Sequence, residues 1–109
     1  FLPAYSASKF AVMGLTQATA QELGKFNITV NAYAPGPLNS VLMKNLAEEG
    51  PEDTGMSAEE WTDKLRQTSP LGRFGELTDI SDLVSFLASS QAKHITGQNI
   101  SVNGGSHCS

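Results

Sequence analysis

The order of helical and extended patterns constrains the fold of this chain more than any other feature. A helical pattern over residues 4–23 precedes an alternating, strand-like segment over residues 28–34. A second helical pattern, which follows Thr78 as its cap, precedes a last extended segment over residues 99–102. Both extended segments are apolar enough to be buried, and strands of this kind joined through helices are typical of parallel sheets. The sequence therefore predicts an α/β fold.

The middle of the chain has a different character. Residues 37–70 form a long excursion with a short helix predicted over residues 41–49, a loop over residues 50–55, and a second short helix beginning at Ser57, where Glu60 completes a capping box. Insertions this long between core elements are often lids or binding loops. We therefore expect a lid-like substrate loop over residues 37–70.

Apolar side chains of this excursion leave two alternatives open. Leu42, Met43, Met56 and Trp61 could line a substrate pocket, or they could simply pack the excursion onto the rest of the protein. Met56 and Trp61 also stand at the two positions of a hydrophobic staple, which supports a helix boundary between them.

The helix over residues 4–23 carries an apolar stripe beside a row of small residues. The stripe is formed by residues that recur every three or four positions: Val12, Leu15, Thr19 and Leu23. The small residues would let another helix approach closely: Ala7, Ala11, Gly14 and Ala18. Gly24 follows as a plausible helix stop.

Three polar residues outside the excursion are assigned structural roles. Asn31 is unusual in a strand, and we expect it to be buried and hydrogen-bonded. Arg73 is expected to brace a turn or an interface. Thr78 is expected to cap the helix that follows it.

Composition and charge exclude several classes of protein. The chain has 109 residues and a formal net charge of −4, which argues against binding to a nucleic-acid backbone. No apolar run is long enough to span a membrane. Cys108 is the only cysteine, and neither His94 nor His107 has a ligand constellation around it. We therefore expect no nucleic-acid partner, no membrane partner and no metal, and a cytoplasmic location, because a lone cysteine fits a reducing compartment.

Tyr5 and Lys9 are the pair with the clearest chemistry. Their spacing puts a phenol and an ammonium on one helix face, one turn apart. A phenol has an ordinary pKa of about 10, and a nearby cation stabilises the phenolate and lowers that pKa. A tyrosine in such a place can pass a proton to or from a substrate oxygen. On spacing alone a solvated surface pair is by far the more common explanation, because many helices carry a tyrosine and a lysine at this interval by chance, so a catalytic role depends on the rest of the sequence.

Four segments in a fixed order carry a resemblance to a known family. They are residues 5–9 (YSASK), residues 28–36 (ITVNAYAPG), residues 70–73 (PLGR) and residues 95–105 (ITGQNISVNGG). Together they resemble the C-terminal portion of a short-chain dehydrogenase/reductase over nearly the whole chain. The resemblance implies a Rossmann-like, doubly wound parallel sheet that binds NAD or NADP. It also implies hydride transfer between the nicotinamide and a carbonyl or secondary-alcohol carbon of a small molecule.

The resemblance assigns a role to two groups of residues. Tyr5 matches the catalytic acid/base of the family, and Lys9 matches the lysine that lowers the pKa of that tyrosine and holds the nicotinamide ribose hydroxyls. A further group matches the cofactor-binding turn: Pro35, Gly36, Leu38 and Ser40.

Within that turn the resemblance separates the roles. Pro35 and Gly36 match the turn beside the nicotinamide. Leu38 falls where the family's backbone usually meets the carboxamide, and Ser40 keeps a hydroxyl where a threonine is common. Pro37 departs from the usual pattern in removing one backbone donor.

The same resemblance implies that residues 1–109 are the C-terminal fragment of a single Rossmann-like domain. The Gly-rich phosphate loop, the residue that separates NAD from NADP, and the catalytic serine would lie upstream of Phe1. Two strands alone are marginally stable. We therefore expect the isolated chain to be inactive and the full-length parent to be a homodimer or homotetramer.

The substrate and the role of the isolated chain have several candidates. The run from Phe10 to Pro35 looks most like acetoin/diacetyl reductases, which implies a small diketone or hydroxyketone as substrate. A 3-oxoacyl-carrier-protein-reductase-like enzyme is the alternative. A non-catalytic fragment or interaction module, acting through the small-residue-rich first helix, is the candidate from a different class.

Overall fold

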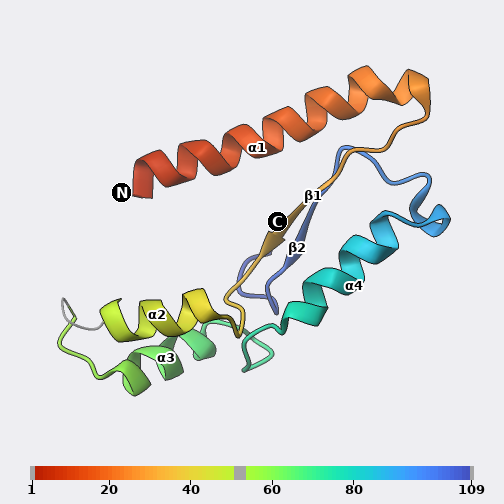
Figure 1. The fold of residues 1–109 in the computed structure, drawn as a ribbon. Coiled ribbons are helices and arrows are strands. Elements are labelled where there is room, and N and C mark those ends of the chain that lie inside the picture. The colour runs from red at the N-terminus through yellow and green to blue at the C-terminus, as the bar shows by residue number, and fades with distance from the viewer. Residues whose placement is uncertain (1, 51–53, 109) are drawn as a thin grey trace. The chain divides into compact units, whose positions relative to one another are not determined.

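A computed structural model describes residues 2–50 and 54–108 of the chain (Figure 1). Its elements follow in this order: α1 (Leu2–Leu23), the 3₁₀ turn η1 (Gly24–Phe26), β1 (Ala32–Pro35), α2 (Val41–Glu49), α3 (Ala58–Gln67), α4 (Leu77–Leu87), the 3₁₀ turn η3 (Ser90–Ala92) and β2 (Asn99–Val102). Three residues of the predicted loop, 51–53, lie outside the described part of the chain.

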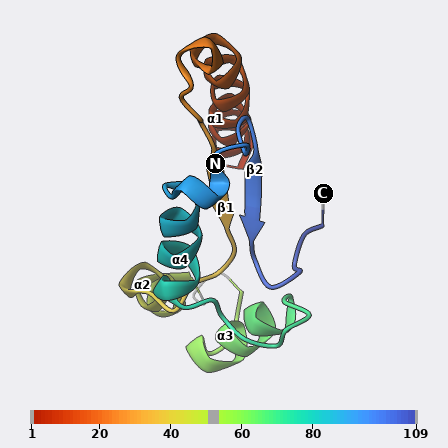
Figure 2. The same cartoon turned by 90° about the vertical axis from the view of Figure 1, so that its right-hand side faces the viewer.

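The two strands pair in parallel. The Ala32 N–H donates to the Gln98 carbonyl at 2.8 Å, and the Gly36 N–H donates to the Val102 carbonyl at 2.9 Å, so both strands advance in the same direction (Figures 1 and 2). This confirms the predicted α/β fold with a parallel sheet. The prediction that both strands are buried is wrong for this chain: exposed and half-buried residues alternate along each. A two-stranded sheet leaves its outer edges and much of its faces open.

The first strand begins later than predicted. Regular pairing starts at Ala32 and not at residue 28, because side chains take over the hydrogen bonds before that point. The Asn31 side-chain amide donates to the Ile95 carbonyl at 2.8 Å, and its oxygen accepts from the Gln98 N–H at 3.1 Å. Asn31 is half-buried, and both ends of its amide are bonded to backbone. The hydrogen-bonded role expected for it is confirmed, whereas the full burial expected for it is not found.

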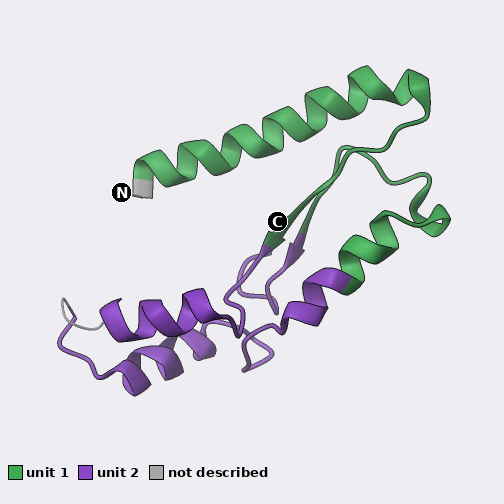
Figure 3. Ribbon diagram, viewed as in Figure 1, with its two compact units in different colours: residues 1–34, 82–100 green, residues 35–81, 101–109 purple. Residues whose placement is uncertain are grey.

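The described residues form two compact units (Figure 3). Unit 1 comprises residues 1–34 and 82–100, and unit 2 comprises residues 35–81 and 101–109.

In unit 1, α1 is covered along one narrow face. Thr16 and Ala20 are buried, and a Cβ placed on Gly97 would lie 3.5 Å from the Ala20 Cβ. The predicted stripe is not the covered face: Val12 is 50% exposed and Leu15 is 69% exposed. The segment around Gly97 lies against α1 at Ala20, so the covered face of the helix carries small and polar residues.

In unit 2, the helices of the excursion follow the prediction closely. The first helix occupies Val41–Glu49 as expected. The Ser57 Oγ accepts from the Glu60 N–H at 3.1 Å, and the Glu60 carboxylate accepts from the Ser57 N–H at 3.0 Å, which confirms the capping box. Met56 and Trp61 are both half-buried, and the staple contact between them stays a prediction.

The fourth helix starts two residues earlier than predicted, since a Thr78 cap would make Asp79 its first residue. It begins at Leu77, so Thr78 lies inside its first turn and does not cap it. The capping group is the Asp79 carboxylate, whose Oδ2 accepts from the Glu76 N–H at 2.8 Å. A carboxylate in the first turn can accept from the N–H of the residue that precedes the helix, as in one half of a capping box. Thr78 lies inside the helix and cannot take the N-cap position.

In residues 2–50 and 54–108, none of the helices combines the length and the apolar character needed to cross a membrane. Nor do three His, Cys, Asp or Glu side chains gather in that part of the chain as a metal site would need.

Candidate functional site

Tyr5 and Lys9 come together on α1. Lys9 follows Tyr5 by one helical turn, and its Nζ lies 5.1 Å from the centroid of the Tyr5 ring. Tyr5 is 51% exposed. Between them in sequence, the Ser8 Oγ donates to the Tyr5 carbonyl at 2.7 Å, so this serine acts as a helix-face residue. The arrangement holds a positive charge beside an accessible phenol.

The turn at the end of β1 depends on a close backbone approach. The Gly36 N–H donates to the Val102 carbonyl at 2.9 Å. A Cβ placed on Gly36 would lie 2.7 Å from the Asn103 Cα, a distance that real Cβ atoms do not tolerate. Pro35 and Gly36 can therefore turn directly against the end of β2 only because residue 36 has no side chain.

Leu38 pairs with Gly75 in an isolated parallel bridge. The Gly75 N–H donates to the Pro37 carbonyl at 3.0 Å, and the Asn39 N–H donates to the Gly75 carbonyl at 2.8 Å. In such a bridge the central residue directs its own N–H and C=O away from the partner. Within residues 2–50 and 54–108, neither group of Leu38 has a hydrogen-bond partner. One donor and one acceptor are thus presented on the far edge of the turn.

Ser40 is the N-cap of α2. Its Oγ accepts from the Met43 N–H at 3.2 Å, and its backbone is extended, with φ −133° and ψ 164°. A hydroxyl that accepts in this way still has its own proton to donate. The side chain can therefore cap the helix and bind a ligand oxygen at the same time.

The predicted site residues thus form two groups. One is the pair Tyr5 and Lys9 in unit 1. The other is the turn over residues 35–40 in unit 2, which holds Pro35, Gly36, Leu38 and Ser40.

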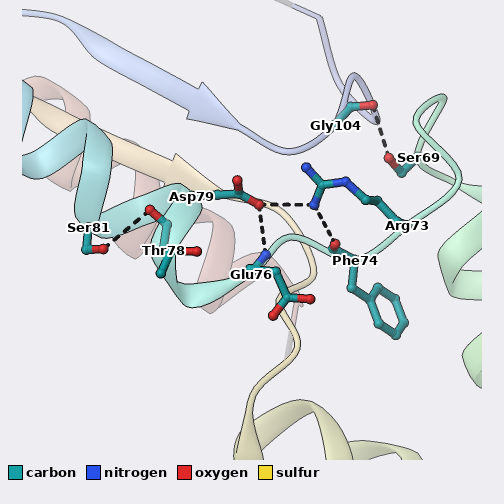
Figure 4. A network of polar contacts seen from close by, with 8 residues as sticks. All are labelled: Ser69, Arg73, Phe74, Glu76, Thr78, Asp79, Ser81 and Gly104. Atoms are coloured by element: carbon teal, nitrogen blue, oxygen red, sulfur yellow. Dashed lines mark hydrogen bonds and ion pairs between the residues drawn. The ribbon is translucent and has the colours of Figure 1, made fainter.

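Arg73 braces the turn that leads into α4 (Figure 4). Its Nη1 donates to the Phe74 carbonyl at 3.0 Å and to Asp79 Oδ2 at 3.1 Å. The Glu76 N–H bonded to the same carboxylate, and then the Arg73 guanidinium, hold the pKa of Asp79 below its usual range. The turn-bracing role expected for Arg73 is confirmed.

Unit 2 has cavities beside the predicted turn and beside the end of the excursion. One, of about 390 Å³, is lined by Ser40, Met43 and Phe74 among others. Another, of about 310 Å³, is lined by Ser69, Arg73 and residues 101–105 among others. Of the side chains considered for a substrate pocket, Met43 faces a cavity beside Ser40, whereas Leu42 is 68% exposed.

Comparison with known proteins identifies the family. A family model described as enoyl-(acyl carrier protein) reductase matches residues 2–107. The chain belongs to the short-chain dehydrogenase/reductase family. This confirms the resemblance carried by its four segments.

Several members of the family are similar to this chain. A diacetyl reductase, (S)-acetoin forming, from Staphylococcus aureus is 41% identical over 104 residues, which are 95% of this chain and 40% of that protein. A 3-oxoacyl-(acyl-carrier-protein) reductase from Staphylococcus epidermidis is 46% identical over 101 residues, 93% of this chain and 37% of that protein. The chain therefore spans about two-fifths of the length of these curated relatives.

A solved structure of this family shares the fold. The crystal structure of an actinorhodin polyketide ketoreductase variant with NADPH superposes with a TM-score of 0.86 at 34% identity, covering 93% of this chain and 39% of that one. The fold is therefore the C-terminal part of a Rossmann-like short-chain dehydrogenase/reductase sheet.

Sequence reasoning missed the residues that shape the turn from a distance. Gly75 pairs with Leu38, and Asn103 backs Gly36, although neither pair is close in sequence. In the sequence, Gly75 lies two residues after the PLGR segment, and nothing local marks it as the partner of Leu38. Which residue a single bridge selects depends on how the chain folds back, and no local pattern gives that register.

Proposed function

We propose that this chain supplies the proton-transfer pair and the nicotinamide-side turn of an NAD(P)-dependent short-chain dehydrogenase/reductase. The observation that carries the proposal is the Tyr5–Lys9 pair, with the ammonium 5.1 Å from the phenol ring on an exposed stretch of α1. The reaction is hydride transfer between the cofactor and a carbonyl or secondary-alcohol carbon. The whole reaction also needs groups beyond the two-fifths of a family member that this chain spans.

In the direction of reduction, the chain's own residues handle the proton. The Tyr5 hydroxyl gives its proton to the substrate oxygen as the carbonyl becomes an alcohol. Lys9 stands beside the phenol and favours the negative charge that Tyr5 acquires. NADH or NADPH, when bound, supplies the hydride that goes to the carbonyl carbon.

The turn over residues 35–40 fits a nicotinamide carboxamide. A carboxamide offers an N–H₂ and a C=O, and the backbone of Leu38 presents one acceptor and one donor without a partner among the described residues. The Ser40 hydroxyl has a proton to donate beside them. These groups would hold and orient the ring end of the cofactor, and Gly36 lets the backbone turn there without a side chain in the way.

For the substrate, we propose a small diketone or hydroxyketone such as diacetyl or acetoin, received by a lid-like excursion over residues 37–70. Similarity to diacetyl reductase supports this choice. A 3-oxoacyl thioester is the second candidate, supported by 46% identity to a 3-oxoacyl-(acyl-carrier-protein) reductase. The cavity beside Ser40 and Met43 supports the excursion as a substrate-facing element in either case.

Rates on matched substrates separate these candidates. With NADH and NADPH tested in turn, the enzyme that contains this chain should reduce diacetyl with a higher kcat/KM than a long 3-oxoacyl thioester. The reverse order would transfer the proposal to the acyl substrates. Absence of reduction of any carbonyl compound with either cofactor would refute the enzymatic proposal.

We further propose that the parent enzyme is a cytoplasmic homo-oligomer, a dimer or a tetramer. Phe10 and Leu15 on α1 are each 69% exposed in this chain, and either the rest of the domain or a partner subunit would cover them. The alternative, a non-catalytic interaction module, would use the same surface.

Fluorescence titration of the 109-residue chain alone tests whether cofactor binding requires the rest of the domain. Saturable NAD(P)H binding by this chain would disprove that requirement.

A further inference from the structure

A buried hydroxyl bonds the C-terminal end of the excursion to the segment that follows β2. Ser69 is 7% exposed, and its Oγ donates to the Gly104 carbonyl at 3.0 Å (Figure 4). The Leu71 N–H donates to the same carbonyl oxygen at 3.3 Å. One carbonyl oxygen therefore accepts two hydrogen bonds, one from the end of the excursion and one from the residue that follows it. Because Ser69 is buried, breaking this bond would leave its hydroxyl without water as a replacement partner, which is unfavourable.

Gly104 and Gly105 form a seat for this contact. Both have positive φ, +61° and +85°, which L side chains rarely adopt. A Cβ on Gly104 would collide with the Ser69 Oγ, and a Cβ on Gly105 would lie 3.1 Å from the Pro70 Cγ. The two glycines are thus shaped to receive Ser69 and Pro70.

The beginning of the excursion is attached to the same stretch of chain. Gly36 is bonded to the Val102 carbonyl and stands against the Asn103 backbone. The Asn103 side chain holds this stretch in shape, because its oxygen accepts from the Gly105 N–H at 3.0 Å and its amide donates to the His107 carbonyl at 2.9 Å. Both ends of the excursion are therefore held by residues 102–104.

We propose that Ser69 is a positioning residue, which fixes the closing end of the excursion relative to the Pro35–Gly36 turn through residues 102–104. This inference rests on the proposed function, in which that turn holds the nicotinamide and the excursion receives the substrate. Without the hydroxyl, the excursion keeps its attachment at Gly36 and loses one of two bonds at its other end. Substrate binding must then order a looser segment, which costs affinity and leaves the chemical step intact.

Ser69→Ala in the complete enzyme tests this inference, with Ser81→Ala as the matched control. Ser81 has an exposed hydroxyl that donates to the Thr78 carbonyl at 3.3 Å, so the control deletes the same atom and a bond of the same kind. Ser69→Ala should raise KM for the carbonyl substrate about three- to tenfold, the equivalent of one lost hydrogen bond. The kcat should change by less than about twofold. Ser81→Ala should leave both constants unchanged.

Ser69→Thr should restore the KM, because it keeps the hydroxyl and the adjoining cavity of about 310 Å³ has room for a methyl group. A lower melting temperature of Ser69→Ala with an unchanged KM would overturn the inference, because a purely structural bond has that signature. A threonine variant as impaired as the alanine variant would also overturn it.

Amide hydrogen exchange provides a readout that does not depend on activity. Ser69→Ala should speed exchange in the last turn of α3, which ends at Gln67, relative to Ser81→Ala. Unchanged exchange there would overturn the inference even in an active enzyme. If the unaltered enzyme reduces no carbonyl compound, the proposed function fails, and the exchange comparison alone still decides whether Ser69 fixes the excursion.

Discussion

The two groups of predicted site residues are built in opposite ways. Tyr5 and Lys9 lie on a largely exposed helix and meet because they are one turn apart. The turn over residues 35–40 is shaped by distant parts of the chain, since Gly75 pairs with Leu38 and Asn103 backs Gly36. Chemistry that needs only two neighbouring side chains can be held by one helix. A turn whose backbone groups bind a cofactor must be held in shape by contacts from other segments of the chain.

Tyr5→Phe should have the largest effect, because it removes the proposed proton donor and leaves the helix intact. Turnover should fall by about a hundredfold to ten-thousandfold, the usual worth of a positioned acid. NAD(P)H binding, followed by fluorescence titration, should stay nearly unchanged. If the variant kept more than about a tenth of the rate, the acid/base assignment would be wrong.

Lys9→Ala should come next and should damage both steps. Loss of the charge beside Tyr5, and of the ribose contact that the family resemblance implies for Lys9, should lower kcat/KM by about tenfold or more and weaken cofactor binding. Lys25→Ala is the matched control, because the Lys25 Nζ also lies 5.1 Å from a ring centroid, that of Phe26. Equal losses in the two variants would mean that removal of a cation beside an aromatic ring, and no catalytic role of Lys9, causes the damage.

Gly36→Ala should show that the turn depends on distant residues in a way that α1 does not. The new Cβ would lie 2.7 Å from the Asn103 Cα, and overpacking of this kind costs about 1–3 kcal/mol. The melting temperature should fall and cofactor binding should weaken. Gly14→Ala is the control, since nothing lies within 4 Å of a Cβ there and alanine in a helix interior is favoured by about 0.5–1 kcal/mol. A neutral Gly36→Ala would contradict the close approach.

Asp79→Asn should have the smallest effect, which should depend on pH. Because the folded protein holds the pKa of Asp79 below its usual 3.8, the carboxylate stabilises the fold above that value, and the stabilisation is lost as pH falls through the lowered pKa. The variant should therefore be less stable near neutral pH and show a flatter acid limb in denaturation curves. Asp82→Asn, one turn further along α4, removes the same charge as a control. Parallel acid limbs for Asp79→Asn and the unaltered protein would exclude this linkage.

Boundary signals in the local sequence made several helices and strands predictable. The helix over Val41–Glu49 and the strand over Asn99–Val102 have the predicted bounds, and Ser57 and Glu60 cap α3 as expected. In each case the signal lies within a few residues of the boundary it sets.

Predictions were wrong where a side chain competed with the backbone pattern. Asn31 takes over hydrogen bonds that would have extended β1 toward residue 28, and the Asp79 carboxylate moves the start of α4 ahead of Thr78. The partners of Asn31 lie more than sixty residues away. A propensity argument at residue 31 has no access to them.

The sequence by itself determined the helical spacing of Tyr5 and Lys9, the helix–strand order and the family. These depend on local periodicity and on motifs in a fixed order. Only the tertiary structure decided that Leu38 pairs with Gly75 and that Asn103 lies too close to residue 36 for any side chain there. It also decided that the Ser69 hydroxyl bonds to the Gly104 carbonyl. These contacts join residues far apart in the chain, and they form only when folding brings the segments to hydrogen-bonding distance.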